Sequence, residues 1–129
     1  MFELDSRLKN DTFDFGSFPL CRVLLLNDCS YPWFILVPQR EALQEIYQLS
    51  EADRQLFWDE SNQLSLWMKH YFNFDKLNIA ALGNVVNQLH LHHVGRTIGT
   101  QLGQILCGDI VRQFLIVIKM LNVYIERSK

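Results

Sequence analysis

The chain has 129 residues, of which 49% are hydrophobic and 20% are charged, as in an ordinary soluble globular domain. These values exclude an intrinsically disordered or collagen-like chain, and the length allows one domain. Twelve Lys and Arg against fourteen Asp and Glu give a net charge of −2, so no broad positive field favours nucleic acid or an anionic membrane. We therefore expect a single domain over residues 1–129, with no nucleic-acid or membrane partner.

The cysteines and the N-terminus both predict a cytoplasmic protein. Cys21, Cys29 and Cys107 are an odd set without CxxC spacing, which favours free thiols in a reducing compartment over a disulfide framework. The first residues carry acid where a signal peptide carries base, and no apolar segment of the required length follows them. Residues 110–125 are the most apolar stretch, but charged and polar residues interrupt it, so we expect core or a subunit interface there.

The first half of the chain predicts a hairpin followed by a long helix. Residues 1–20 favour extended or loop structure with one short turn of helix. Residues 21–26 (CRVLLL) and 33–37 (WFILV) have the length and composition of strands, and the polar segment between them is typical of a turn. A capping pattern that begins at Ser50, followed by apolar residues at three- and four-residue spacings, predicts a helix over residues 51–72.

The second half predicts another strand pair and a C-terminal helix. Residues 77–82 and 88–94 have strand character, and a polar corner that contains Asn84 separates them. The order strand, strand, helix, strand, strand implies an α+β fold in which the long helix packs across one face of an antiparallel sheet. Residues 97–108 are expected to be a loop, and apolar spacing predicts a helix over residues 109–127.

Three of the four histidines, His90, His92 and His93, lie within four residues. In a strand, His90 and His92 would share a face with Gln88, and His93 would point to the opposite face. Three interpretations are open: a metal site, a nucleophile with an orienting partner, or polar residues on a solvated face. No companion lies at zinc-ligand spacing, so no metal or other cofactor is expected. A neutral imidazole can attack phosphorus while a second one hydrogen-bonds the same group.

Residues 88–94 (QLHLHHV), which follow residues 80–87 (AALGNVVN), carry a family resemblance. They resemble the signature of the histidine triad (HIT) family, His-apolar-His-apolar-His-apolar-apolar, and are similar to a bacterial branch that has Gln at the first triad position. The resemblance covers a core of about residues 20–96. It implies a HIT-like sheet and a homodimer that pairs through the long helix and a sheet edge.

The resemblance also implies a function: a nucleotide hydrolase or nucleotidyl transferase acting at the α-phosphate of nucleoside phosphoramidates, dinucleoside polyphosphates or related nucleotides. Its partner would be a purine nucleotide or nucleotide conjugate. In that family, the positions of His90, His92 and Gln88 are those of the nucleophile that forms a nucleotidyl-histidine, a phosphate donor and the residue that orients the nucleophile. The positions matching nucleotide contacts are Asp28 for the ribose hydroxyls, Asn27 beside it in the turn, and Asn78 and Asn84 around the phosphates.

Two departures from the family pattern leave a second function open. Gln88 replaces the first histidine of the triad, and residues 102–108 (LGQILCG) lack the Trp- and Pro-rich pattern that is common in that branch. The alternative is a nucleotide-binding regulatory module with weak or no turnover.

Overall fold

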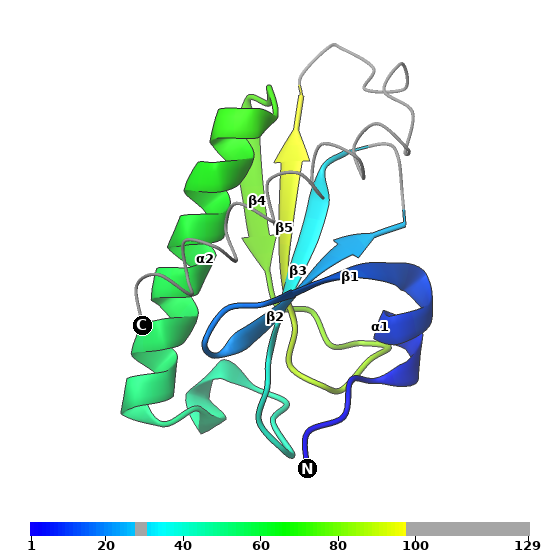
Figure 1. Ribbon diagram of the computed structural model, residues 1–129, viewed down its shortest axis with the longest axis vertical. Helices are drawn as coiled ribbons and strands as arrows, with labels where there is room; N and C mark the ends of the chain where they lie inside the picture. The colour runs from blue at the N-terminus through cyan, green and yellow to red at the C-terminus, as the bar shows by residue number, and fades with distance from the viewer. Residues whose placement is uncertain (28–30, 98–129) are drawn as a thin grey trace.

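The computed structural model describes residues 1–27 and 31–97 (Figure 1). Its secondary structure confirms the predicted hairpin, long helix and second strand pair, contains a short helix in the N-terminal region as expected, and adds a strand there. In chain order the elements are α1 (Ser6–Asp11), β1 (Thr12–Ser17), β2 (Cys21–Leu26), β3 (Trp33–Pro38), the 3-10 helix η1 (Ile46–Gln48), α2 (Glu51–Tyr71), β4 (Lys76–Ala80) and β5 (Leu91–Arg96).

The N-terminal region is more regular than its sequence indicates. The Asp5 carboxylate accepts a hydrogen bond from the Arg7 backbone N–H at 2.8 Å and so caps the start of α1. Strand β1 then pairs antiparallel with β2, with an irregular register between Asp14 and Ser17. Its Gly and flanking polar residues favour a loop locally, but pairing with the apolar strand β2 outweighs that preference. The region expected to be extended or loop, with one short turn of helix, thus contains the short helix α1 and the six-residue strand β1.

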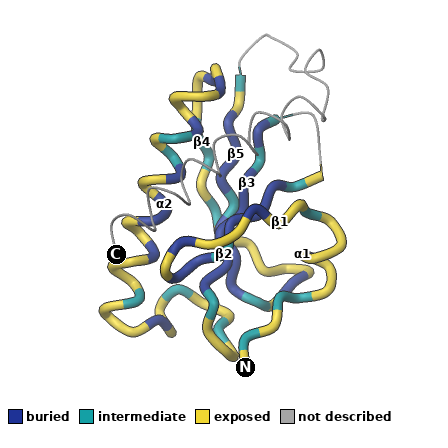
Figure 2. Tube along the Cα trace, viewed as in Figure 1, coloured by how far each residue is buried: buried dark blue, intermediate teal, exposed yellow. Residues whose placement is uncertain are grey.

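The strands form one antiparallel sheet in the order β1-β2-β3-β5-β4. Helix α2 lies along one face of this sheet and α1 lies on the other side (Figure 1). Most residues of β2, β3 and β5 are buried (Figure 2). A large apolar cluster fills the α2 side, and a smaller one on the α1 side contains Leu8, Leu24, Ile35, Val37 and Val86.

Helix α2 begins where the capping pattern predicts. The Ser50 hydroxyl accepts a hydrogen bond from the Asp53 backbone N–H at 3.1 Å. The buried stripe of the helix includes two polar residues, Glu60 and Ser61, among Phe57, Leu64 and Met68. The Glu60 carboxylate accepts hydrogen bonds from the backbone N–H groups of Leu20 and Cys21 at 2.9 and 2.8 Å, and its burial raises its pKa.

Strand β5 begins later than the sequence predicts. It pairs with β3 from Leu91 and with β4 from His92 onward, whereas residues 88–90 precede the strand. In that preceding segment the Leu89 backbone N–H donates to the Leu43 carbonyl at 2.9 Å, so the chain is held by a loop instead of by a neighbouring strand. Near the other end of β5, Gly95 packs directly on a phenyl ring, because a Cβ there would lie 2.6 Å from Phe74.

Several expectations fall outside the described residues. These are the loop from residue 98 onward, the C-terminal helix over residues 109–127, and the thiols of Cys29 and Cys107. Cys21 is a buried free thiol, as expected. No helix in the described ranges is long and apolar enough to cross a bilayer.

Candidate functional site

The two histidines expected to act together lie side by side on the sheet face away from α2. His92 on β5 pairs with Ile35 of β3 and Ala80 of β4. The ring centroids of His90 and His92 are 4.8 Å apart, with an interplanar angle of 74°. His90 is only 7% exposed, so the interpretation as fully solvated polar residues does not fit this pair.

The backbone determines which nitrogen of His90 carries a proton. Its Nδ1 lies 2.7 Å from the carbonyl oxygen of Gln88. A carbonyl oxygen can only accept, so Nδ1–H is the donor. In the neutral ring, Nε2 then has the free lone pair, and the ring cannot rotate without losing this bond. The geometry thus provides a fixed imidazole with a nucleophilic nitrogen.

A tryptophan sets the opposite tautomer on His92. The indole Nε1–H of Trp33 donates to His92 Nδ1 at 2.9 Å, and the two rings are edge to face with centroids 5.7 Å apart. Because indole can only donate, Nδ1 is an acceptor and the proton of the neutral ring lies on Nε2. Burial, reinforced by the neighbouring His90, lowers the pKa of His92 to about 4. His92 is therefore a neutral hydrogen-bond donor near pH 7.

His93 lies on the opposite face, as the strand alternation predicts. It is fully buried against α2, where the Ser61 hydroxyl is 2.7 Å from Nε2. Nδ1 lies 3.2 Å from the Leu91 carbonyl oxygen, so Nδ1–H donates there and Nε2 accepts from Ser61. Burial lowers the pKa of His93 to about 4. This imidazole belongs to the core.

A cavity of about 350 Å³ opens beside His90 and His92. Its walls combine apolar side chains with a few polar and charged groups, a composition typical of small-molecule sites. Three wall residues come from α1, which the sequence analysis did not assign to the site: Arg7, Leu8 and Asp11. The other lining residues are Leu26, Ile35, Leu82, Gly83, Asn84, Val85 and Val86.

The predicted asparagines occupy different places relative to this cavity. Asn84 lines it, next to Gly83, whose φ of 79° is in the left-handed region that favours glycine. Asn78 on β4 pairs with Val94, on the same sheet face but outside the cavity lining. Asn27 follows β2, and its backbone N–H donates to the Asp11 carbonyl at 2.9 Å. Asp28 lies outside the described residues.

The side chain of Gln88 makes its hydrogen bonds with the N-terminal segment. Its Oε1 accepts from the Asp5 backbone N–H, and its Nε2 donates to the Glu3 carbonyl, both at 2.8 Å. The group of Gln88 that holds His90 is instead its own carbonyl. Gln88 therefore contacts the nucleophile candidate through the backbone.

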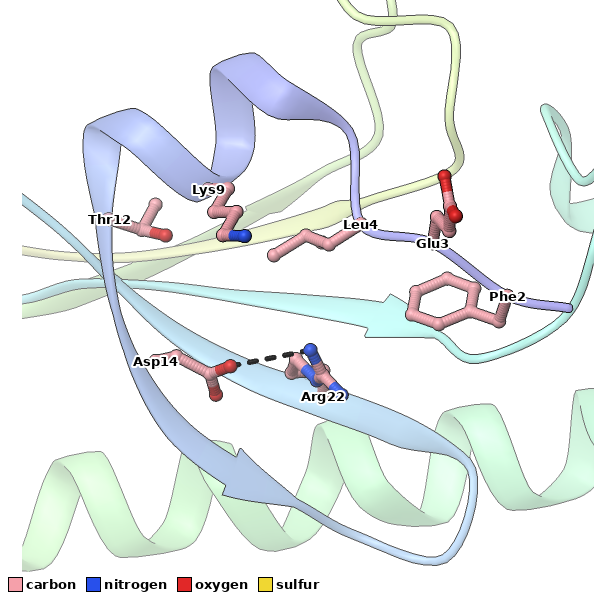
Figure 3. A pocket seen from close by; sticks show the side chains of 7 residues that line it. All are labelled: Phe2, Glu3, Leu4, Lys9, Thr12, Asp14 and Arg22. Carbon is pink, nitrogen blue, oxygen red and sulfur yellow. Dashed lines mark ion pairs between the residues drawn. The ribbon is translucent and has the colours of Figure 1, made fainter.

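A second hollow of about 520 Å³ lies between the N-terminal segment and strands β1 and β2 (Figure 3). Phe2, Glu3 and Leu4 border one side of it, and the Arg22 guanidinium lies 3.4 Å from Asp14 on the other. This hollow contains none of the histidines. Within residues 1–27 and 31–97, no three His, Cys, Asp or Glu side chains are grouped to hold a metal ion.

The sequence analysis did not assign Trp33 or the α1 residues to the site, although one signal in the sequence pointed to each. Trp33 alternates with Ile35 on the same face of β3, and Ile35 pairs with His92. The apolar residue in the short helical turn is Leu8, which is buried where α1 meets the cavity. Neither signal specifies a partner by itself, because the contact of Trp33 with His92 and the place of Leu8 in the cavity wall both depend on the packed sheet.

Residues 7–98 match the model of the HIT domain family. No curated protein matches the chain. Among crystal structures, a histidine triad protein from Marinobacter aquaeolei VT8 has 49% identity and a TM-score of 0.75, covering 77% of this chain and 72% of its own.

Two further crystal structures of histidine triad proteins each cover 92% of this chain and 96% of their own, with a TM-score of 0.82. They come from Bradyrhizobium japonicum, at 37% identity, and Sinorhizobium meliloti 1021, at 33%. Together with the family match, these likenesses show that this chain belongs to the HIT domain family, whose members are generally nucleotide-binding hydrolases or transferases.

Proposed function

We propose that this protein is a nucleotide hydrolase or nucleotidyl transferase in which His90 attacks the α-phosphorus of a purine nucleotide conjugate. Candidate substrates are nucleoside phosphoramidates and dinucleoside polyphosphates. The observation that carries the proposal is the hydrogen bond from His90 Nδ1–H to the Gln88 carbonyl, because it leaves the Nε2 lone pair for attack. Membership of the HIT domain family supports the same chemistry.

The proposed reaction has two steps. In the first, the Nε2 lone pair of His90 forms a P–N bond, and the bond between phosphorus and the leaving group breaks. The leaving group keeps that electron pair and takes up a proton from solvent. His92 donates its Nε2–H to a phosphate oxygen and stabilises the negative charge that develops there. In the second step, the oxygen of water or of another acceptor bonds to phosphorus and gives up its proton to solvent. The P–N bond breaks, its electron pair returns to His90 Nε2, and the nucleotide is released.

The rest of the proposed site holds the nucleoside. The apolar walls of the cavity suit a purine base, and Asn84 and nearby backbone N–H groups suit the phosphates. We assign Asp28 to the ribose hydroxyls, with Asn27 beside it and Asn78 near the phosphates. If Asp28 has this role, Asp28→Ala should weaken binding of ribonucleotides more than of their deoxy analogues; equal weakening would contradict it.

Trapping of the covalent intermediate tests the mechanism. A nucleoside phosphoramidate labelled at the α-phosphate should transfer its label to the protein, and the adduct should survive a quench in base and be released by acid. His90→Asn should abolish labelling and turnover while nucleotide binding remains, and His92→Asn should retain some labelling. His70→Asn is the matched control, because His70 lies on α2, on the other side of the sheet.

A nucleotide-binding regulatory module remains the alternative. The observation that favours it is that the Gln88 side chain bonds to the N-terminal segment instead of to His90. If the wild-type protein binds nucleotide but yields neither adduct nor product with phosphoramidates or dinucleoside polyphosphates, the alternative replaces the enzyme.

The proposal includes a homodimer in the cytoplasm. Helix α2 leaves Trp58, Leu66 and Tyr71 45%, 64% and 42% exposed, and the edge strand β4 exposes 43% of Ile79, so both proposed pairing elements present apolar surface. The buried free thiol of Cys21 supports a reducing compartment. Sedimentation should give twice the chain mass of 15.2 kDa at micromolar concentration, and a monomer would contradict the dimer.

A further inference from the structure

We infer that Gln88 is a positioning residue whose side chain clamps the N-terminal segment and thereby holds α1 as a wall of the cavity. The clamp itself is independent of the enzyme chemistry. Its effect on nucleotide binding rests on the proposed function, because that proposal puts the nucleotide in this cavity.

The clamp consists of two backbone hydrogen bonds to one carboxamide. Asp5 N–H donates to Oε1, and Nε2–H donates to the carbonyl of Glu3, both at 2.8 Å, between residues 83 and 85 positions apart in sequence. A carboxamide presents an acceptor and a donor side by side, as a neighbouring strand does. The two nitrogens of an imidazole point in divergent directions, so a histidine cannot reproduce this pair of bonds.

The clamp connects directly to the first turn of α1. Asp5 is the N-cap residue: its carboxylate accepts from the Arg7 N–H at 2.8 Å, and its carbonyl accepts from the Lys9 N–H at 2.9 Å. Leu8, one residue after Arg7, is 5% exposed and lines the cavity. A shift at Asp5 therefore moves the cavity wall with it.

The other contacts of the N-terminal segment hold it only in part, so the clamp adds to them. Helix α1 has six residues, and an isolated helix of that length is unstable in water. Phe2 and Leu4 are only half-buried: they pack against the smaller apolar cluster on one side and, with Glu3, border the hollow of about 520 Å³ on the other, so packing holds them from one side only (Figure 3). The carboxamide supplies a fixed anchor between that hollow and the cavity beside His90.

Hydrogen exchange at the Asp5 amide measures the clamp directly. Gln88→Met removes both hydrogen bonds at similar side-chain length, so the Asp5 amide should exchange about tenfold faster than in the wild type. Gln55→Met is the matched control, because Gln55 is an exposed residue on α2. Unchanged exchange at Asp5 in Gln88→Met would overturn the clamp.

Binding and rate measurements test what the clamp does. With adenosine 5′-monophosphate as the probe, Gln88→Met should raise Kd by about tenfold. Labelling of His90 at saturating phosphoramidate separates the two roles: loss of the clamp should act mainly on Kd, whereas loss of a side chain that oriented the nucleophile would lower the saturating rate without raising Kd. Faster exchange with unchanged Kd, or a lowered saturating rate with unchanged Kd, would overturn the positioning role. If even the wild type fails to bind the probe, the proposed function fails, and amide exchange still decides the clamp.

A second variant removes one of the two clamp bonds, the one donated by the Asp5 N–H, by changing the N-terminal segment instead of Gln88. Asp5 has φ −53° and ψ 138°, which proline adopts, so Asp5→Pro deletes the N–H donor without strain. Asp5→Ala is its control, because it loses the same cap but keeps the N–H. Asp5→Pro should weaken binding of adenosine 5′-monophosphate more than Asp5→Ala does, and Asp5→Pro combined with Gln88→Met should weaken it by less than the sum of the two separate effects, because both changes remove the Asp5 bond. Full additivity of the two changes would contradict a shared clamp.

Discussion

The buried pair of His93 and Ser61 predicts that stability falls in mild acid. The folded protein holds His93 with a pKa of about 4, whereas an unfolded histidine titrates near 6.5. Below about pH 6.5 the unfolded chain therefore binds a proton that the folded chain excludes, and the free energy of unfolding decreases as the pH falls towards 4. From pH 8 to pH 5 this one group should cost about 2 kcal/mol.

Urea unfolding of wild type and His93→Leu at pH 8 and pH 5 measures this cost. Other titrating groups change both proteins alike, so the informative quantity is the difference between their free energies of unfolding. At pH 8 the variant loses the hydrogen bond to Ser61 and should be less stable. At pH 5 its disadvantage should be smaller by about 2 kcal/mol, because leucine binds no proton.

Two controls separate titration from packing. Ser61→Ala removes the hydroxyl but keeps the imidazole, so it should be destabilised at both pH values and retain the pH dependence. His70→Leu removes a histidine from the surface of α2 and should leave most of the pH dependence in place. A difference between wild type and His93→Leu that stays the same at both pH values would refute the argument from burial.

Three further substitutions test contacts described above. Trp33→Phe should let His92 populate both tautomers and slow adduct formation about tenfold; ¹⁵N NMR of the ring would show the change, and an unchanged spectrum would contradict the indole's role. Gly95→Ala should lower the free energy of unfolding by about 1–3 kcal/mol as Phe74 is displaced, and a neutral effect would contradict the close approach. Glu60→Gln should cost about 1–3 kcal/mol in urea unfolding, because the two backbone N–H groups donate to different carboxylate oxygens and the amide nitrogen that replaces one of them cannot accept; Glu51→Gln is its exposed control.

Local patterns predicted the parts of the fold that local interactions determine. The helix from Glu51 follows from its Ser50 cap and apolar spacing, and the strand alternation correctly placed His92 and His93 on opposite faces. These features need only the period of a helix or a strand. His90 precedes the strand and still lies beside His92.

Contacts between distant residues could not be predicted in this way. Trp33 meets His92 across 59 positions, and Gln88 meets Glu3 across 85. Nothing near either residue specifies its partner, because the pairing depends on strand order and on the path of the N-terminal segment. The position of β1 was missed for the same reason, since its pairing with β2 outweighs a loop-like composition.

The smaller apolar cluster has a consequence for how this protein can change over evolution. Leu8, Ile35 and Val86 belong to that cluster and also line the cavity beside His90. A substitution that reshapes the cavity for another ligand therefore removes packing from the fold at the same position, and new specificity carries a penalty in stability. The larger cluster under α2 lies across the sheet and can absorb compensating substitutions. We expect variants with altered cavities to acquire their stabilising changes on the α2 side.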